Sequence, residues 1–182
     1  MTSTDVLLLL IVAGAFLFGF FWGVIRGLLG LAGFVVVFVL SAHLSEPVGD
    51  YLAAQWTGYL PAYDHMLAYF IVFVLLYTVT LVLITIGTRG SQDLSRYPLV
   101  DDVVGALLGA TLAILCIAAV IAILKTWYGP VAPAAGQGAE WTAVAYRALL
   151  GSTFGGQIAD SVVPALTLLL GILLPASVRK LL

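Results

Sequence analysis

The residues best suited to metal chemistry lie in one polar stretch of the sequence: His43, Glu46, Asp50, Asp64 and His65. His43 and Glu46 are three positions apart, so in a helix they would share a face. A metal-dependent enzyme would need His43 and His65 to reach the same ion. Because the stretch lacks the His-Glu-x-x-His spacing of zinc enzymes, solvated side chains at a membrane surface explain these residues more simply. His43, Glu46 and His65 therefore stay minor metal candidates, and no cofactor is expected.

The sequence offers few candidate nucleophiles or general bases for nucleophilic catalysis. The stretch "GSTFG" at residues 151–155 has Thr153 where a nucleophile elbow requires serine. The single cysteine, Cys116, lies in an apolar run, and the chain has only two histidines. We expect a protein that is not an enzyme.

The composition is typical of a membrane protein. Of 182 residues, 63% are hydrophobic and 9% are charged, whereas soluble domains have about 25% charged residues. Seven Lys and Arg residues and a net charge of -2 provide no basic surface for nucleic acid. The lipid bilayer is the expected partner, and nucleic acid is excluded.

The first apolar run, residues 6–42, contains Arg26 as its only charged side chain. As one helix the run would be about 55 Å long, too long for a hydrocarbon core about 30 Å thick. It should therefore turn back, and Gly19, Gly23 and Gly27 give the backbone freedom for this near Arg26. At a turn the guanidinium reaches headgroups or water, whereas at mid-bilayer it would cost about 2.5 to 3.5 kcal/mol.

The predicted fold is an all-α, polytopic integral membrane bundle, with residues 1–182 as a single membrane domain. Its four core transmembrane helices span about residues 5–23, 27–43, 66–88 and 103–124, with a polar interruption between the second and third. A C-terminal apolar segment over about residues 158–178 is either a fifth span or a re-entrant or interfacial segment. Asp160 with Ser161 is the simplest start for its helix.

Lys and Arg residues in short loops favour the cytoplasm and so predict the orientation. Arg26 places the first turn inside, and Arg89 with Arg96 places the loop after the third span inside. The acidic stretch after the second span is then outside, as is the N-terminus. Lys125 and Arg147 oppose this scheme mildly, because it places both of them outside.

Glycines recur at intervals of four in two predicted helices: Gly19, Gly23 and Gly27, then Gly105 and Gly109. This spacing puts small residues on one face and lets a second backbone approach closely. We expect the glycines to pack helices within the subunit, with a homo-oligomer interface as the alternative.

Arg26 has two interpretations. The simpler is an anchor at the membrane surface that follows the distribution of positive charge. The other is an ion pair with Asp101 or Asp102, which would join the first hairpin to the fourth helix. Asp5 is no partner for it, being about 30 Å away along the first helix.

The motifs resemble those of the colicin V production protein family. They are Asp5 before the first helix, "GVIRG" with Gly23, Arg26 and Gly27, and "DDVVGALLG" with Asp101, Gly105 and Gly109. The resemblance covers about residues 5–125 in matching order and spacing. The sequence departs from the family pattern at Leu31, where members often carry Glu, and at Leu112 and Ala113, where they often carry Arg-Gly.

The resemblance implies a multi-pass protein of the bacterial cytoplasmic (inner) membrane, associated with toxin (bacteriocin) production or export and more loosely with envelope stress. We interpret the chain as a non-enzymatic accessory or scaffold protein, since transporters usually need ionisable groups within their spans. A small oligomeric channel or transporter is the alternative. A homo-oligomer or another membrane protein is the expected protein partner.

Overall fold

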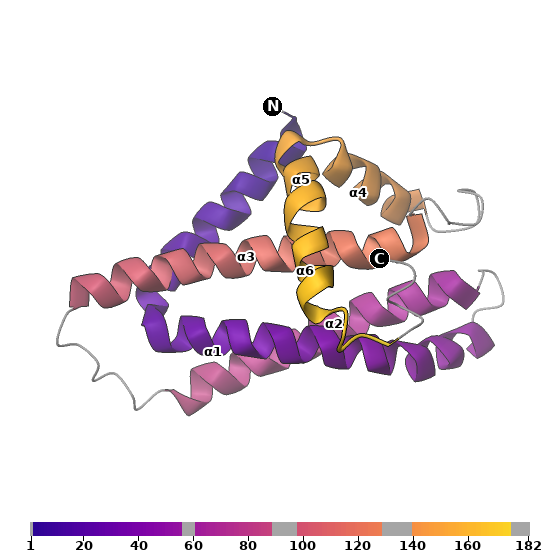
Figure 1. Ribbon diagram of the computed structural model, residues 1–182, viewed down its shortest axis with the longest axis horizontal. Helices are drawn as coiled ribbons and strands as arrows, with labels where there is room; N and C mark the ends of the chain where they lie inside the picture. Colours follow the sequence, from indigo (N-terminus) through magenta and orange to yellow (C-terminus); the bar gives the residue numbers. More distant parts are fainter. Residues whose placement is uncertain (1, 56–60, 89–97, 129–139, 176–182) are drawn as a thin grey trace.

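The computed structural model describes residues 2–55, 61–88, 98–128 and 140–175. Three long helices come first: α1 (Ser3–Gln55), α2 (Pro61–Gly87) and α3 (Pro98–Tyr128). They are followed by α4 (Glu140–Leu150), α5 (Thr153–Gln157), the π-helical turn η1 (Ile158–Val162) and α6 (Val163–Leu170). All regular structure in the described residues is helical, which confirms the all-α fold class (Figure 1).

Helix α1 bends sharply at Gly23, where φ is 74° and ψ is 177°. We call residues 3–22 the first arm and residues 24–55 the second arm; in Figure 1 the two arms form a V. At 1.5 Å per residue the first arm is about 30 Å long, which matches one hydrocarbon thickness. The reversal expected near Arg26 is thus a one-residue kink, with no loop between the arms.

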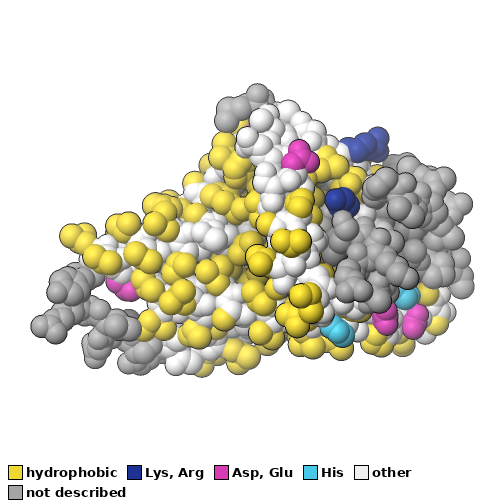
Figure 2. All heavy atoms as spheres, in the orientation of Figure 1, with side chains coloured by type: hydrophobic (Ala, Val, Ile, Leu, Met, Phe, Trp, Pro, Cys, Tyr) yellow, Lys and Arg dark blue, Asp and Glu magenta, His cyan; other side chains and the backbone are white. Residues whose placement is uncertain are grey.

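Four helices among the described residues are long and apolar enough to cross a bilayer: Ser3–Gln55, Tyr63–Gly87, Leu99–Thr126 and Thr153–Leu170. The bend at Gly23 divides the first of these into two apolar arms. Hydrophobic side chains are spread over the described part of the face shown in Figure 2, with isolated charged side chains among them. A surface of this kind suits contact with lipid chains.

The second arm and α2 pack through aromatic side chains. Phe34, Phe38, Tyr69, Phe73 and Tyr77 are buried, and neighbouring ring centroids lie 5.8 to 6.1 Å apart. Edge-to-face and offset pairs of this kind contribute about 0.5 to 1.5 kcal/mol each beyond burial. The Tyr69 hydroxyl donates to the Phe38 carbonyl at 3.2 Å, so this buried phenol has a partner.

The predicted polar interruption after residue 43 is wrong over its first part, because α1 continues as helix to Gln55 and includes Pro47. One face of this extension, with Ser45 and Gly49, is buried against the start of α2. A Cβ at Gly49 would lie 2.9 Å from the His65 Cα, so the two backbones are nearly in contact there. Packing of this kind supplies helix stability that a polar composition does not indicate. Residues 56–60 lie outside the described residues.

The C-terminal segment begins earlier than predicted. Its helix starts at Thr153, and the N-cap is Ser152, whose Oγ accepts from the Gly155 amide at 3.0 Å. Asp160 lies inside η1 and is exposed. Pro164 lies two residues after the end of η1. A proline ring clashes with the carbonyl four residues back, here that of Asp160, which accounts for the π-helical geometry.

The segment from α5 to α6 crosses α3 and does not run beside it (Figure 1). Its apolar helix covers 18 residues and ends at Leu170, with a turn over residues 171–174. The remainder of the predicted span, residues 176–178, lies outside the described residues, as do Arg89 and Arg96.

The charge distribution predicts that Asp102 faces the cytoplasm and Asp50 faces the opposite side. We expect Asp50→Cys, in a Cys116→Ala background, to react with a membrane-impermeant maleimide in intact spheroplasts. Asp102→Cys should react only after permeabilisation. Labelling of Asp102→Cys before permeabilisation, with Asp50→Cys protected, would reverse the orientation; the Cys116→Ala parent controls for background.

Candidate functional site

The bend in α1 is held by a residue of α3. The Val24 amide donates to the Asp101 Oδ1 at 3.0 Å. This amide is free because the kink at Gly23 interrupts the helical hydrogen bonds, and a carboxylate is a strong substitute acceptor. A Cβ at Gly23 would lie 2.5 Å from the Asp101 Oδ2, and a φ of 74° is rare for other residues. Both space and backbone conformation therefore require glycine at this position.

The first arm and α3 touch backbone to backbone. A Cβ at Gly105 would lie 2.6 Å from the Gly19 carbonyl oxygen and 2.8 Å from the Gly23 Cα. One at Gly109 would lie 3.0 Å from the Gly19 Cα. Close approach of this kind replaces side-chain packing in membrane helices. Gly27 likewise allows close packing of the second arm, where it lies against the Leu108 side chain.

Arg26 binds the end of α2. Its Nε donates to the Thr88 hydroxyl at 2.8 Å, and its Nη2 donates to the Thr88 carbonyl at 3.2 Å. A cation at a helix C-terminus interacts favourably with the last carbonyl groups. Thr88 is 8% exposed, so these hydrogen bonds are largely shielded from solvent.

The proposed ion pair between Arg26 and Asp101 or Asp102 is wrong: neither carboxylate pairs with Arg26, whose guanidinium bonds to Thr88. Asp101 contacts the bend itself, whereas the Arg26 side chain extends from the second arm to the end of α2. We call this meeting point of three helices the junction; it consists of Gly19, Gly23, Arg26, Thr88, Asp101, Gly105 and Gly109.

The sequence profile of the colicin V production protein family matches residues 4–153. The chain belongs to the colicin V production protein family. The matched region includes Asp5 and every residue of the junction. Together with its long apolar helices, this membership makes the chain a multi-pass membrane protein. No curated protein and no solved structure matched the chain.

Asp5, the first motif residue of this family member, caps two helices at once. Its Oδ2 accepts from the Thr2 amide at 2.7 Å, and its own amide donates to the Thr2 Oγ1 at 3.3 Å. This reciprocal arrangement is a capping box with aspartate in place of glutamate. Its Oδ1 accepts from the Phe154 amide at 2.9 Å, in the first turn of α5. Asp5 is 1% exposed and joins the start of the chain to the C-terminal segment.

The metal candidates are not assembled into one site. His65 Nε2 lies 3.1 Å from the Asp50 Oδ1, while His43 Nδ1 lies 2.9 Å from the Val39 carbonyl of its own helix. In the described part of the chain, no group of three or more His, Cys, Asp or Glu side chains could hold a metal ion. The hypothesis of a metal-dependent enzyme thus lacks a donor set among these residues.

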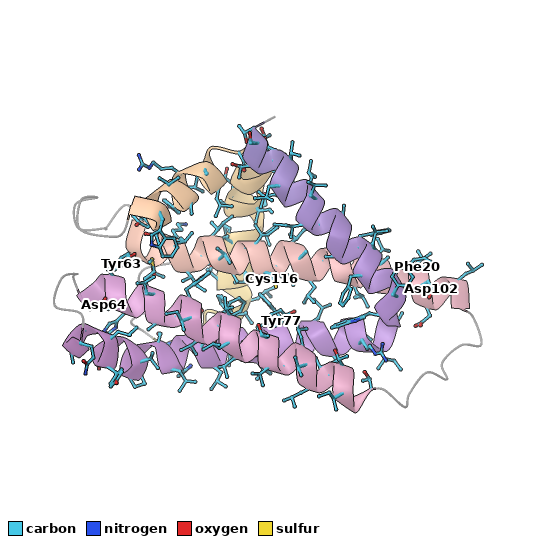
Figure 3. The ribbon with its side chains drawn as sticks, turned by 180° about the vertical axis from the view of Figure 1, so that it is seen from behind. Phe20, Tyr63, Asp64, Tyr77, Asp102 and Cys116 are labelled. Carbon is cyan, nitrogen blue, oxygen red and sulfur yellow. The ribbon has the colours of Figure 1, made fainter. Side chains whose placement is uncertain are left out.

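Sequence reasoning missed a polar contact among α2, α3 and α4. The Thr142 hydroxyl of α4 lies 3.3 Å from the Tyr63 hydroxyl and 2.5 Å from the Tyr128 hydroxyl. The Tyr128 ring also stacks on Tyr146, with centroids 5.3 Å apart. Tyr63 lies at the end of α2 remote from the bend (Figure 3). The aromatic residues were a signal for this contact, but nothing in their spacing indicated a shared hydroxyl.

Alanine at Gly105 should destabilise the protein by about 1 to 3 kcal/mol, since its methyl group would overlap the backbone of the first arm. The matched control is Gly14→Ala on the first arm, where a Cβ meets no atom within 4 Å. Thermal unfolding in detergent should show a loss for Gly105→Ala and no loss for Gly14→Ala. Equal unfolding temperatures for the two variants would contradict the close packing.

The bond between Arg26 and Thr88 should give a coupling energy of about 0.5 to 1.5 kcal/mol in a double-mutant cycle of Arg26→Ala with Thr88→Val. Thr111→Val is the control, because the Thr111 hydroxyl bonds only to the Leu107 carbonyl of its own helix. For each cycle, unfolding free energies are measured in detergent for the wild type, the two single variants and the double variant. The interaction is refuted if the Thr88 cycle is as additive as the Thr111 cycle.

Proposed function

We propose that this colicin V production protein family member is a non-enzymatic accessory protein of the bacterial cytoplasmic membrane. It supports production or export of a peptide toxin, or maintenance of the cell envelope. Family membership supplies the biological setting, and the accessory role is our inference from how the motif residues are used.

The observation that carries the proposal is that the motif residues form packing contacts and hydrogen bonds. Gly19, Gly105 and Gly109 bring two backbones together, and Asp101 bonds to the amide at the bend. The Arg26 guanidinium bonds to the end of α2. An active site would instead direct such groups toward a substrate position. The motifs therefore support a role in building a defined membrane shape that another component recognises.

The interior of the described helices favours an accessory role over transport by one subunit. The cavity between the arms of α1 is lined mainly by apolar side chains and glycine, and its polar side-chain groups belong to Trp22, Tyr77 and Cys116, none of them charged at neutral pH. The buried carboxylates, Asp5 and Asp64, lie in the first turns of α1 and α2. Ion and proton paths usually need ionisable groups within the spans. A pore formed between subunits is the alternative function, and the purification experiment below must distinguish it from the accessory role.

The first arm offers a surface for a membrane partner. Its glycine face is covered by α3, while Leu10, Leu17 and Phe21 are 64%, 61% and 80% exposed. In a bilayer these side chains contact either lipid or another transmembrane helix. Because the bend sets the direction of the arm, a partner would recognise a shape as well as an apolar surface.

Affinity purification in mild detergent, with mass spectrometry and native mass determination on the same sample, tests the proposal. We expect a stoichiometric complex with a different membrane protein. An unrelated multi-pass protein with the same tag controls for adventitious capture. A homo-oligomer without such a partner would contradict the accessory role and favour transport, which a liposome flux assay would then measure directly.

A further inference from the structure

An apolar cavity of about 180 Å³ lies between the two arms of α1, α2 and α3. Gly19, Gly105 and Gly109 form one wall, which has no side chains. Phe18 and Trp22 of the first arm also line the cavity, with ring centroids 4.7 Å apart. Phe18 is 56% exposed, so the cavity reaches the lipid-facing surface beside it.

Tyr77 gives this cavity a hydrogen-bond donor. The residue is 9% exposed, and its hydroxyl has no oxygen or nitrogen partner among the described residues; the neighbouring group is the Cys116 thiol. Figure 3 shows Tyr77 of α2 and Cys116 of α3 between the helices. A thiol is only a weak hydrogen-bonding group, so Cys116 does not replace an oxygen acceptor. Buried hydroxyls usually have an acceptor, and this one borders an open cavity.

The depth of Tyr77 restricts what the acceptor can be. Ten residues separate it from Gly87 and sixteen from Pro61, or about 15 Å and about 24 Å along α2. The hydrocarbon core is about 30 Å thick, so the hydroxyl lies near its middle. Phospholipid ester groups remain near the membrane surface. The acceptor must therefore belong to a molecule whose polar atoms enter the middle of the bilayer.

The size of the cavity restricts the ligand further. An apolar cavity of about 150 Å³ holds one benzene molecule, so this cavity has room for a single substituted ring. A wall of glycines accepts a flat face, and the Phe18 and Trp22 rings provide aromatic contact at the opening. The matching ligand is a membrane-dissolved single ring that carries a carbonyl oxygen.

We propose that this cavity binds the ring of an isoprenoid quinone, with one quinone carbonyl accepting a hydrogen bond from the Tyr77 hydroxyl. Quinones dissolve in the bilayer interior and carry the carbonyl groups that phospholipid chains lack. The isoprenoid tail would leave beside Phe18 into lipid. The site needs no protein partner, so it stands independently of the accessory role.

Tryptophan fluorescence of the full chain in detergent tests the proposal, since a bound quinone quenches a neighbouring indole and Trp22 lines the cavity. Trp56, Trp127 and Trp141 are replaced by phenylalanine so that Trp22 reports alone. The probe is a short-chain ubiquinone. We expect saturable quenching, weakened about tenfold by Tyr77→Phe, which corresponds to about 1.4 kcal/mol.

Tyr69→Phe is the matched control, because Tyr69 is also a buried phenol of α2 but bonds to the Phe38 carbonyl. It should leave quinone affinity unchanged. An alkylbenzene of equal chain length, which has no carbonyl, should compete at least tenfold more weakly than the quinone. Equal competition would show a site for any apolar chain and would overturn the proposal, as would equal affinity of Tyr77→Phe and the wild type or the absence of saturation.

A photoreactive quinone provides a second measurement on the wild-type protein, which does not depend on how Tyr77→Phe folds. Cross-links should map to peptides of α2 and α3 that contain Tyr77 and Cys116. Cross-links confined to other parts of the chain would place the quinone elsewhere and reject this cavity as its site.

Discussion

At the bend of α1, the hydrogen bond from the Val24 amide to Asp101 replaces one that a continuous helix would make. The positive φ of Gly23 turns the chain, and the carboxylate from α3 satisfies the amide that the turn exposes. A carboxylate is a stronger acceptor than a neutral carbonyl, so this hydrogen bond stabilises the bend. With the bend fixed in this way, the first arm is directed along α3, and the glycine faces meet and form one wall of the cavity between the arms.

Two modes of packing meet in α1. The second arm contacts α2 through large aromatic rings, whereas the first arm contacts α3 near the bend through glycine and the bare backbone. Helices in a bilayer gain little from leaving lipid, so association depends on contact area and hydrogen bonds. Nearer its start the first arm packs through side chains, since buried Leu8 lies in one hydrophobic cluster with Ile117 and Ile121 of α3. Hydrogen bonds from Asp101 at the bend and Asp5 at the start hold its two ends. Its position therefore depends on glycine packing near the bend, apolar packing near the start and a polar group at each end.

The sequence was informative wherever the physics is local. Apolar length predicted the helices, and the glycines around Arg26 predicted the change of direction; the motif spacing indicated the family. It was less informative where distant segments meet. Pro47 and the polar residues around it suggested a loop, but burial of Gly49 against α2 keeps that segment helical. Asp160 looked like a helix start, yet the cap is Ser152. Opposite charges suggested that Arg26 pairs with aspartate, although a threonine hydroxyl and a helix-end carbonyl bind it.

The hydrogen bond between Asp5 and Phe154 has a consequence for biogenesis, because the two residues are 149 positions apart. Translation at about 5 to 20 residues per second separates their synthesis by about 7 to 30 seconds. During that interval the first arm is in the membrane without its C-terminal attachment. Until α3 is synthesised, the glycine face of the arm is also uncovered. The nascent chain thus passes through a period in which its earliest segment must be sheltered by lipid, the insertion machinery or a neighbouring helix.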